Sequence, residues 1–167
     1  GENLDDAFFA GTQGAQLALK LEDSESTYAS DYIGIVPSLP TYTFTATYQT
    51  TSPNQTIKIA HDIDAYPIAG AANRLISIDY GDGTNGTSST HTYAAQGEHT
   101  VTFSFVNEVT EIGEHAFKEC SQLTGIEYPK NITKISDKAF HKTGIIDIII
   151  PNTVTHIGKS AFEECIN

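Results

Sequence analysis

Apolar residues recur at fixed distances along the last third of the chain, and the whole pattern repeats. Residues 109–131 begin with VTEIGEHAFKEC, residues 132–153 with ITKISDKAFHKT, and residues 154–167 with VTHIGKSAFEEC. Successive copies are offset by 23 and then 22 residues, inside the range of about 20–50 residues that is typical of repeat proteins. A unit of this size cannot bury its own apolar side, so we expect the copies to stack and to share one core.

Each copy predicts the same local structure. The apolar positions at its start lead into a short helical turn that carries Ala-Phe, as at Ala116-Phe117. Alternating apolar residues follow and predict strands at residues 126–128 and 148–150. Proline lacks an amide hydrogen, so Pro129 and Pro151 are expected to end these strands.

Short alternating segments also occupy the chain ahead of the repeats. Residues 42–48 read YTFTATY, and residues 56–60, 76–80 and 99–106 are further predicted strands. Gly, Pro and Asn separate them, which is typical of a β-sandwich. Residues 1–40 form an N-terminal β segment, and whether it belongs to the sandwich stays open.

Two motifs resemble known families. The V/I-T-x-I-G/S-x-x-A-F-x-x-C pattern of residues 109–167 resembles BspA-like leucine-rich repeat surface proteins. The aromatic-Gly-Asp-Gly-Thr turn at residues 80–84, followed by His-Thr-Tyr, resembles a PKD-type domain, an immunoglobulin-like sandwich. The resemblances imply a mainly β chain. A PKD-like sandwich at about residues 41–107 would continue into a leucine-rich-repeat solenoid at residues 108–167, with about 2.5 repeats, parallel strands and short helical turns.

The last predicted strand of the sandwich falls in register with the repeats. Counting 23 residues back from Ile126 reaches Phe103. We therefore expect residues 100–106 to pair in parallel with residues 125–128 and to cap the open end of the solenoid.

The charge of the chain disfavours two classes of partner. Twenty-one acidic residues against nine basic ones give a formal net charge of −12. Nucleic acids and anionic membranes are bound by clustered Lys and Arg, so neither is an expected partner. No run approaches the roughly 20 apolar residues that span a bilayer, so we expect no membrane insertion by this segment. Because methionine is absent, including at position 1, we expect that an N-terminal leader has been removed. The resemblance to surface proteins implies a lipid or wall anchor in a segment outside this sequence.

The two cysteines occupy equivalent positions two repeats apart. Strands lie about 4.8 Å apart, so two steps exceed the roughly 7 Å between Cα atoms that a disulfide allows. We therefore predict that Cys120 and Cys165 are buried, reduced thiols. His115, His141 and His156 align with Lys or Glu in other copies, so we expect them on a solvated face rather than in a site.

No pattern indicates catalysis or a cofactor. A nucleophile–base pair and a paired-carboxylate constellation are both missing, so we expect no enzyme and no catalytic residue. Asp79 and Asp82 of the Gly-Asp-Gly turn are weak calcium candidates, because clustered oxygens suit that ion. Local capping of the turn is the favoured interpretation, and no metal site is predicted.

The resemblances imply a bacterial, extracellular cell-surface module for adhesion or protein interaction, most simply a monomer. The expected partner is an extracellular or host-surface protein, with a glycan as the alternative. A carbohydrate-binding accessory module and a structural spacer remain alternative functions. Period-two alternation sends one predicted binding row outward, namely Thr102, Ser104, Glu127, Asp147 and Ile149.

Overall fold

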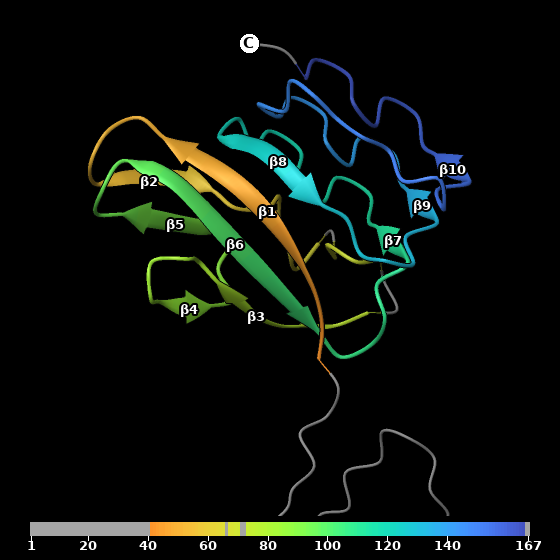
Figure 1. The fold of residues 1–167 in the computed structure, drawn as a ribbon, viewed down its shortest axis with the longest axis horizontal. Helices are drawn as coiled ribbons and strands as arrows, with labels where there is room; N and C mark the ends of the chain where they lie inside the picture. Colours follow the sequence, from red (N-terminus) through yellow and green to blue (C-terminus); the bar gives the residue numbers. More distant parts are fainter. Residues whose placement is uncertain (1–40, 66, 71–72, 166–167) are drawn as a thin grey trace, which may run out of the picture. The chain divides into compact units, whose positions relative to one another are not determined.

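A computed structural model describes residues 41–65, 67–70 and 73–165. The N-terminal β segment expected in residues 1–40 lies outside the described residues. Within them the chain is mainly β, as predicted, with strands in three sheets and no helix (Figure 1). Among these residues no helix is long and apolar enough to cross a bilayer.

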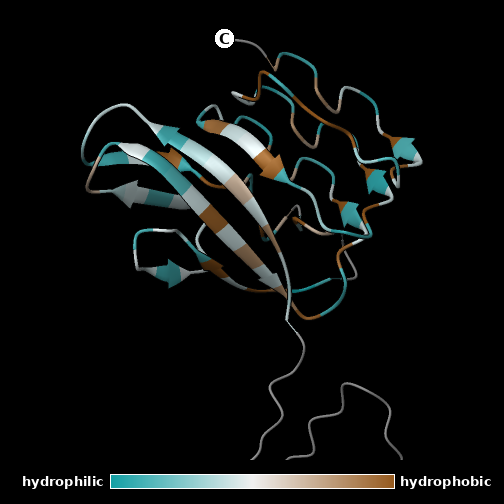
Figure 2. Cartoon of the chain, viewed as in Figure 1, coloured by the Kyte–Doolittle hydropathy of each residue, from teal (hydrophilic) through white to brown (hydrophobic). Residues whose placement is uncertain are grey.

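The largest sheet has five strands in the order β4-β3-β6-β1-β8, and every neighbouring pair is antiparallel. Its strands are β1 (Tyr42–Thr50), β3 (Leu75–Asp79), β4 (Asn85–Gly86), β6 (Gly97–Phe105) and β8 (Leu123–Glu127). Hydropathy alternates along β6 (Figure 2), because successive side chains point to opposite faces. Val101, Phe103 and Phe105 of β6 are buried against Phe44 of β1, whose ring stacks on both phenylalanines.

The pairing predicted from the register of the repeats is wrong. β8 pairs with β1 in antiparallel fashion, with Ala46 opposite Ile126, so β1 separates β8 from β6. β6 already has β1 on one edge and β3 on the other. The edge of β1 that faces away from β6 accommodates the strand of the first repeat. The register match between residues 100–106 and 125–128 reflects a similar spacing of apolar residues and does not mean that the two strands are neighbours in the sheet.

The three copies do stack in parallel, but at other positions than expected. β7 (Glu111–Ile112), β9 (Lys134–Ile135) and β10 (His156–Ile157) form a parallel sheet in the order β10-β9-β7. The strand predicted at residues 148–150 is absent, although Ile148 and Ile150 pack against the core. β1 gives the first copy's strand a partner, whereas no described strand pairs with residues 148–150.

The Ala-Phe segments are not the predicted helical turns. In the first copy, His115 and Glu119 have positive φ angles of 57° and 63°, and the equivalent residues of the next two copies share this conformation. A residue in the left-handed region interrupts a right-handed helix. Successive backbone amides therefore alternate between hydrogen bonds within a copy and hydrogen bonds to the next copy. Ala116 N donates to Gly113 O within the copy, whereas Phe117 N donates to Ala139 O of the next copy.

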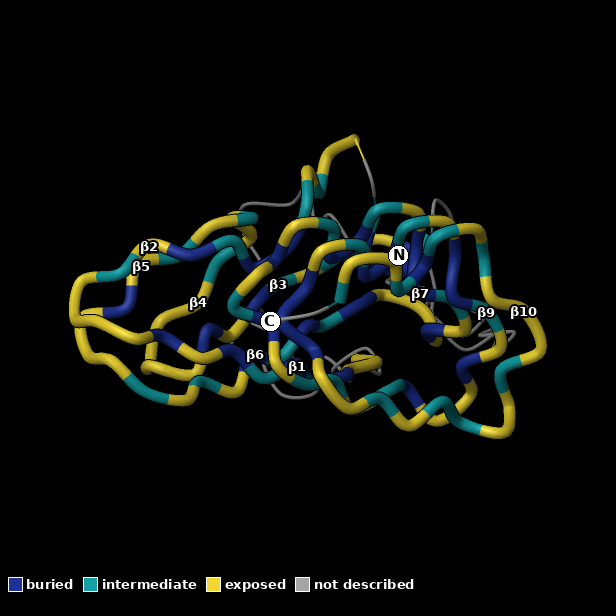
Figure 3. Tube along the Cα trace, turned by 90° about the horizontal axis from the view of Figure 1, so that it is seen from above, coloured by how far each residue is buried: buried dark blue, intermediate teal, exposed yellow. Residues whose placement is uncertain are grey.

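One core runs from the large sheet into the repeats. Phe117, Phe140 and Phe162 stack as a ladder, with ring centroids 5.4 and 5.3 Å apart, and Phe103 meets Phe117 edge-on at 5.7 Å. Buried and exposed positions alternate along the repeat segments (Figure 3), so each copy contributes apolar side chains to the same interior.

The near end of the stack is closed by residues 59–65 and 67–70 of the connection that follows β2 (Gln55–Lys58). Gly113 N donates to Ile68 O at 2.7 Å, as Gly158 N donates to Ile135 O at 2.7 Å between true copies. His61 N likewise donates to Ala116 O at 2.8 Å. This connection, rather than the strand predicted at residues 100–106, therefore caps the first repeat.

Candidate functional site

The outward face of β1 and β6 carries a patch of small hydroxyl side chains, which we call the hydroxyl face. Thr43 lies opposite Ser104, Thr45 opposite Thr102, and Thr47 opposite Thr100. Alternation explains the arrangement, because the inward positions of both strands are apolar and the outward ones are not. The hydroxyl face consists of Thr43, Thr45, Thr47, Thr100, Thr102 and Ser104.

Acidic residues border this face on both sides. Thr45 Oγ1 donates to Glu127 Oε2 of β8 at 3.3 Å, and Asp79 of β3 lies opposite Thr102. Glu98 lies opposite Gln49 at one end of the β1–β6 pair. The centre of the face is uncharged, although the chain carries a net charge of −12.

The structure gathers only part of the predicted binding row. Thr102, Ser104 and Glu127 do point outward from the sheet, but β1 stands between β6 and β8. Asp147 and Ile149 are exposed on a segment without strand structure, and Ile149 is 88% exposed. None of the described strands includes these two residues.

Four residues of the face were missed from sequence, namely Thr43, Thr45, Thr47 and Thr100. The signal was present, since residues 42–48 alternate strictly between aromatic or small apolar residues and threonine. The alternation predicted a strand, but neither of its faces was assigned to binding. Adjacency to residues 100–104 required knowledge of the strand order.

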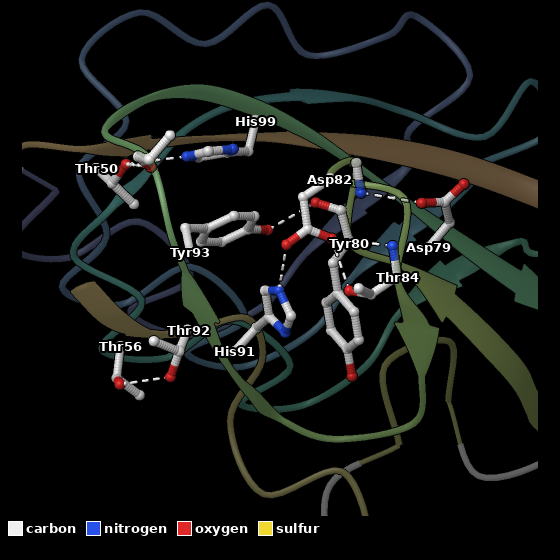
Figure 4. A network of polar contacts seen from close by, with 12 residues as sticks. Thr50, Thr56, Asp79, Tyr80, Asp82, Thr84, His91, Thr92, Tyr93 and His99 are labelled. Atoms are coloured by element: carbon white, nitrogen blue, oxygen red, sulfur yellow. Dashed lines mark hydrogen bonds and ion pairs between the residues drawn. The ribbon is translucent and has the colours of Figure 1, made fainter. Parts of the chain in front are cut away.

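The Gly-Asp-Gly turn is held by a network of polar contacts (Figure 4). Asp79 Oδ1 accepts from Gly81 N at 2.9 Å. Asp82 Oδ1 accepts from Thr84 N at 3.0 Å and from Thr84 Oγ1 at 2.6 Å. These bonds cap the turn from within, as short acidic side chains do in tight turns.

Asp82 also joins the turn to β5 (Thr90–Tyr93). Its Oδ2 lies 2.7 Å from His91 Nε2. Burial opposes ionisation, but the hydrogen bonds from Thr84 and the contact with His91 outweigh it and lower the pKa of Asp82 to about 2. The Asp82 carboxylate is therefore ionised at neutral pH, and both of its oxygens are engaged by Thr84 and His91.

Aromatic rings complete this network. The His91 ring stacks on Tyr80 with centroids 4.1 Å apart, and the Tyr93 ring stacks on His99 at 3.7 Å. Tyr93 OH donates to Tyr80 O at 2.8 Å. His99 Nε2 lies 2.9 Å from Thr50 Oγ1 on β1. The network thus ties β5 and the turn to the large sheet, which is a structural role.

The calcium candidates offer little to an ion. One carboxylate oxygen of Asp79 and one of Asp82 already accept hydrogen bonds inside the turn, and the other oxygen of Asp82 contacts His91 of β5. In the part of the chain that the structure describes, no group of three His, Cys, Asp or Glu residues is placed to hold a metal ion.

Two histidines and one cysteine depart from their expected environments. The side chains of His115 and His141 are only 15% and 12% exposed, so they are not on a solvated face. The His115 ring lies 6.0 Å from the ring of His61, which precedes the repeats, and His141 Nε2 is 3.5 Å from Glu164 Oε1 of the third copy. His156 is exposed, as predicted.

Both cysteines are free thiols, as predicted. Cys120 is fully buried, and burial raises the pKa of its thiol far above the ordinary value. Cys165 is only half-buried, which corrects the prediction for this residue, because no further copy among the described residues covers it. Its Sγ lies 3.3 Å from Thr143 Oγ1, the equivalent position of the second copy.

Comparison with known proteins identifies one family. The model described as BspA type Leucine rich repeat region (6 copies) matches residues 73–167. The match covers all three copies and extends upstream over β3 to β6. No curated protein and no solved structure matches the chain.

Proposed function

Because the chain belongs to the BspA-type leucine-rich repeat family, we propose that it is a non-catalytic protein-interaction module that mediates adhesion at a bacterial cell surface. The proposal includes a PKD-type sandwich at residues 41–107 and a solenoid that starts at residue 108. The internally capped Gly-Asp-Gly turn supports the first, and the parallel stacking of β7, β9 and β10 supports the second.

The observation that carries the proposal is the hydroxyl face. It lies on regular sheet, so its side chains are held in fixed rows about 4.8 Å apart across strands. Hydroxyl groups donate and accept hydrogen bonds, and an uncharged face avoids the large desolvation cost of buried charges. Such a face suits the polar surface of an extracellular protein, and the acidic border disfavours an acidic partner.

The interaction is expected to be weak for each copy. Binding energy usually concentrates in Trp, Tyr and Arg, and the hydroxyl face contains none of these. Many copies displayed on one surface would raise the apparent affinity by about 10²–10⁴ without any new contact. An adhesion module can therefore bind weakly through each copy and still hold firmly when many copies are displayed on one surface.

A glycan is the second candidate partner, and the neutral, hydroxyl-rich centre favours it. The described face lacks the row of exposed aromatic rings on which sugars stack, so the protein partner is preferred.

The test uses an array of extracellular proteins and glycans, probed with the protein multimerised on beads. Thr102→Arg places a bulky side chain at the centre of the face. Its control is Thr92→Arg on β5, because Thr92 is also an exposed threonine paired across strands, with its Oγ1 2.7 Å from Thr56 Oγ1. Binding that is lost with Thr102→Arg and kept with Thr92→Arg supports the proposal. Equal effects of the two variants would reject the hydroxyl face.

A further inference from the structure

A hollow lies between the connection that follows β2 and the beginning of β3. Its volume is about 440 Å³, inside the range of about 300–1,000 Å³ that is usual for small-molecule sites. None of its lining residues belongs to the hydroxyl face. They come from the connection, from the beginning of β3 and from the residue after β4, namely Ile63, Asp64, Pro67, Ile68, Asn73, Arg74, Leu75 and Thr87.

Hydrogen bonds hold the backbone on two sides of this hollow. On one side Ile68 O accepts from Gly113 N of the first repeat at 2.7 Å. On the other side Arg74 O accepts from Val106 N, directly after β6, at 3.1 Å. The hollow therefore has its shape before any ligand arrives, as small-molecule sites usually do.

Burial separates the floor of the hollow from its mouth. Ile68 and Asn73 are buried and form the floor, and the Asn73 amide already donates to the backbone oxygens of residues 107 and 108. Ile63 and Leu75 are half-buried and pack against the core. The interior of the hollow therefore offers mainly apolar contact to a ligand.

Two exposed charged residues, Asp64 and Arg74, line the mouth. Arg74 is the only arginine in the sequence. Lys58, Lys134 and Lys142 are each paired with a glutamate, whereas neither the Arg74 guanidinium nor the Asp64 carboxylate has a hydrogen bond or ion pair within the part of the chain that the structure describes. The mouth thus carries one uncommitted charge of each sign.

We propose that this hollow binds an apolar dipeptide with both termini free. Guanidinium groups bind carboxylates through two parallel hydrogen bonds, so Arg74 takes the C-terminal carboxylate. Asp64 takes the N-terminal ammonium, and the apolar side chains of the peptide lie on Ile63 and Leu75. The arrangement of charges favours a ligand that carries both signs over a simple anion or cation.

The size of the hollow sets the length of the peptide. A sphere of the same volume is about 9 Å across. Two extended residues span about 7 Å, whereas three span about 10 Å. A dipeptide therefore fits, and a longer peptide would project into solvent.

The test titrates the protein with Leu-Leu and follows backbone amide resonances by nuclear magnetic resonance. Resonances of Leu75 and Thr87 should shift, and that of Thr45 on the hydroxyl face should not. We expect a dissociation constant of about 1 mM, as for a small ligand with solvent-exposed charges. N-acetyl-Leu-Leu and Leu-Leu amide each lack one charge and should bind about fivefold more weakly, the upper limit for an exposed ion pair.

Variants assign each charge to its partner. Arg74→Gln should weaken Leu-Leu about fivefold and leave the affinity for Leu-Leu amide unchanged, because the amide has no carboxylate to lose. Asp64→Asn should weaken Leu-Leu likewise and leave the affinity for N-acetyl-Leu-Leu unchanged. Lys130→Gln is the matched control, because it removes another exposed positive charge, outside the hollow, and should have no effect.

Three results would overturn the proposal. They are the absence of shifts with 10 mM Leu-Leu, equal affinities for the free and the blocked peptides, and equal weakening of Leu-Leu binding by Lys130→Gln and Arg74→Gln. The inference is independent of the hydroxyl face, so Thr102→Arg should bind Leu-Leu like the wild type.

Discussion

Gly113→Ala tests whether residues 59–70 cap the repeat stack. A Cβ built on Gly113 would lie 2.1 Å from Pro67 O and 3.1 Å from Gly70 N, and contacts under 3.0 Å are essentially never seen. The capping connection must therefore move by about 0.9 Å, the difference between 3.0 and 2.1 Å. The second copy has Ser136 at the equivalent position, so the repeat itself accepts a side chain there.

The cost combines two effects. Displacing a packed backbone costs about 1–3 kcal/mol, and weakening the bond from Gly113 N to Ile68 O costs about 1 kcal/mol more. We expect the free energy of unfolding to fall by about 2–4 kcal/mol, which lowers the melting temperature by roughly 4–16 °C in a chain of this size. Urea unfolding followed by far-ultraviolet circular dichroism measures the change in the free energy of unfolding.

Gly125→Ala is the control for this experiment. Gly125 lies in β8, and its nearest neighbour to an added Cβ is Thr47 Cβ at 3.7 Å, an ordinary contact. Because glycine in a strand carries an entropic cost, this variant should be neutral or stabilised by up to about 1 kcal/mol. Surface substitutions usually change the free energy of unfolding by no more than about 0.5 kcal/mol. If the free energies of unfolding of Gly113→Ala and Gly125→Ala differ by less than this, the cap does not contribute to stability as argued.

Three further predictions concern charge, thiols and the aromatic ladder. The pKa of Asp82 is about 2, below its ordinary 3.8, so the ionised carboxylate stabilises the folded state above pH 4, and this stabilisation is lost as the pH falls toward 2. Asp82→Asn should lower the free energy of unfolding by about 1–2 kcal/mol at pH 7 and should flatten its dependence on pH in acid. A thiol reagent should label Cys165 in the folded protein and Cys120 only on unfolding, and two equally fast groups would contradict the burial of Cys120. Phe140→Ala, between two stacked rings, should cost about 3–5 kcal/mol by thermal unfolding, clearly more than Phe162→Ala, whose ring stacks on Phe140 alone among the described rings.

The repeats and their core were predictable from sequence because their signals are local. The 22- and 23-residue offsets fix which residues correspond, and Ile112, Ile135, Phe117 and Phe140 are all fully buried, as stacking requires. The alternation in residues 42–48 and 99–106 likewise gave β1 and β6 and their inward faces.

Strand order was not predictable, because it depends on which edges are free. The sequence shows similar spacing around Phe103 and Ile126, but it does not show that β1 covers one edge of β6 and offers its own other edge to β8. The hydroxyl face was assigned only in part for the same reason. Its threonines on β1 join those on β6 through pairing between residues about 57 apart, as in Thr45 with Thr102.

The cap could not be predicted from sequence either, because residues 59–70 do not contain the repeat motif. Their backbone groups take the place of a preceding copy: Ile68 supplies a carbonyl to Gly113, and His61 supplies an amide to Ala116. Backbone groups are common to all residues, so sequence similarity does not reveal this equivalence.

The first repeat depends on residues before it at two separate places. β8 needs β1 as its sheet partner, and the Gly113–Ala116 segment needs residues 59–70 to satisfy its backbone. Stacked repeats gain most of their stability from neighbours, so an end repeat must obtain a neighbour elsewhere. Here the residues that precede the repeats supply both a strand and a cap, and the buried apolar residues of the two parts belong to one continuous core.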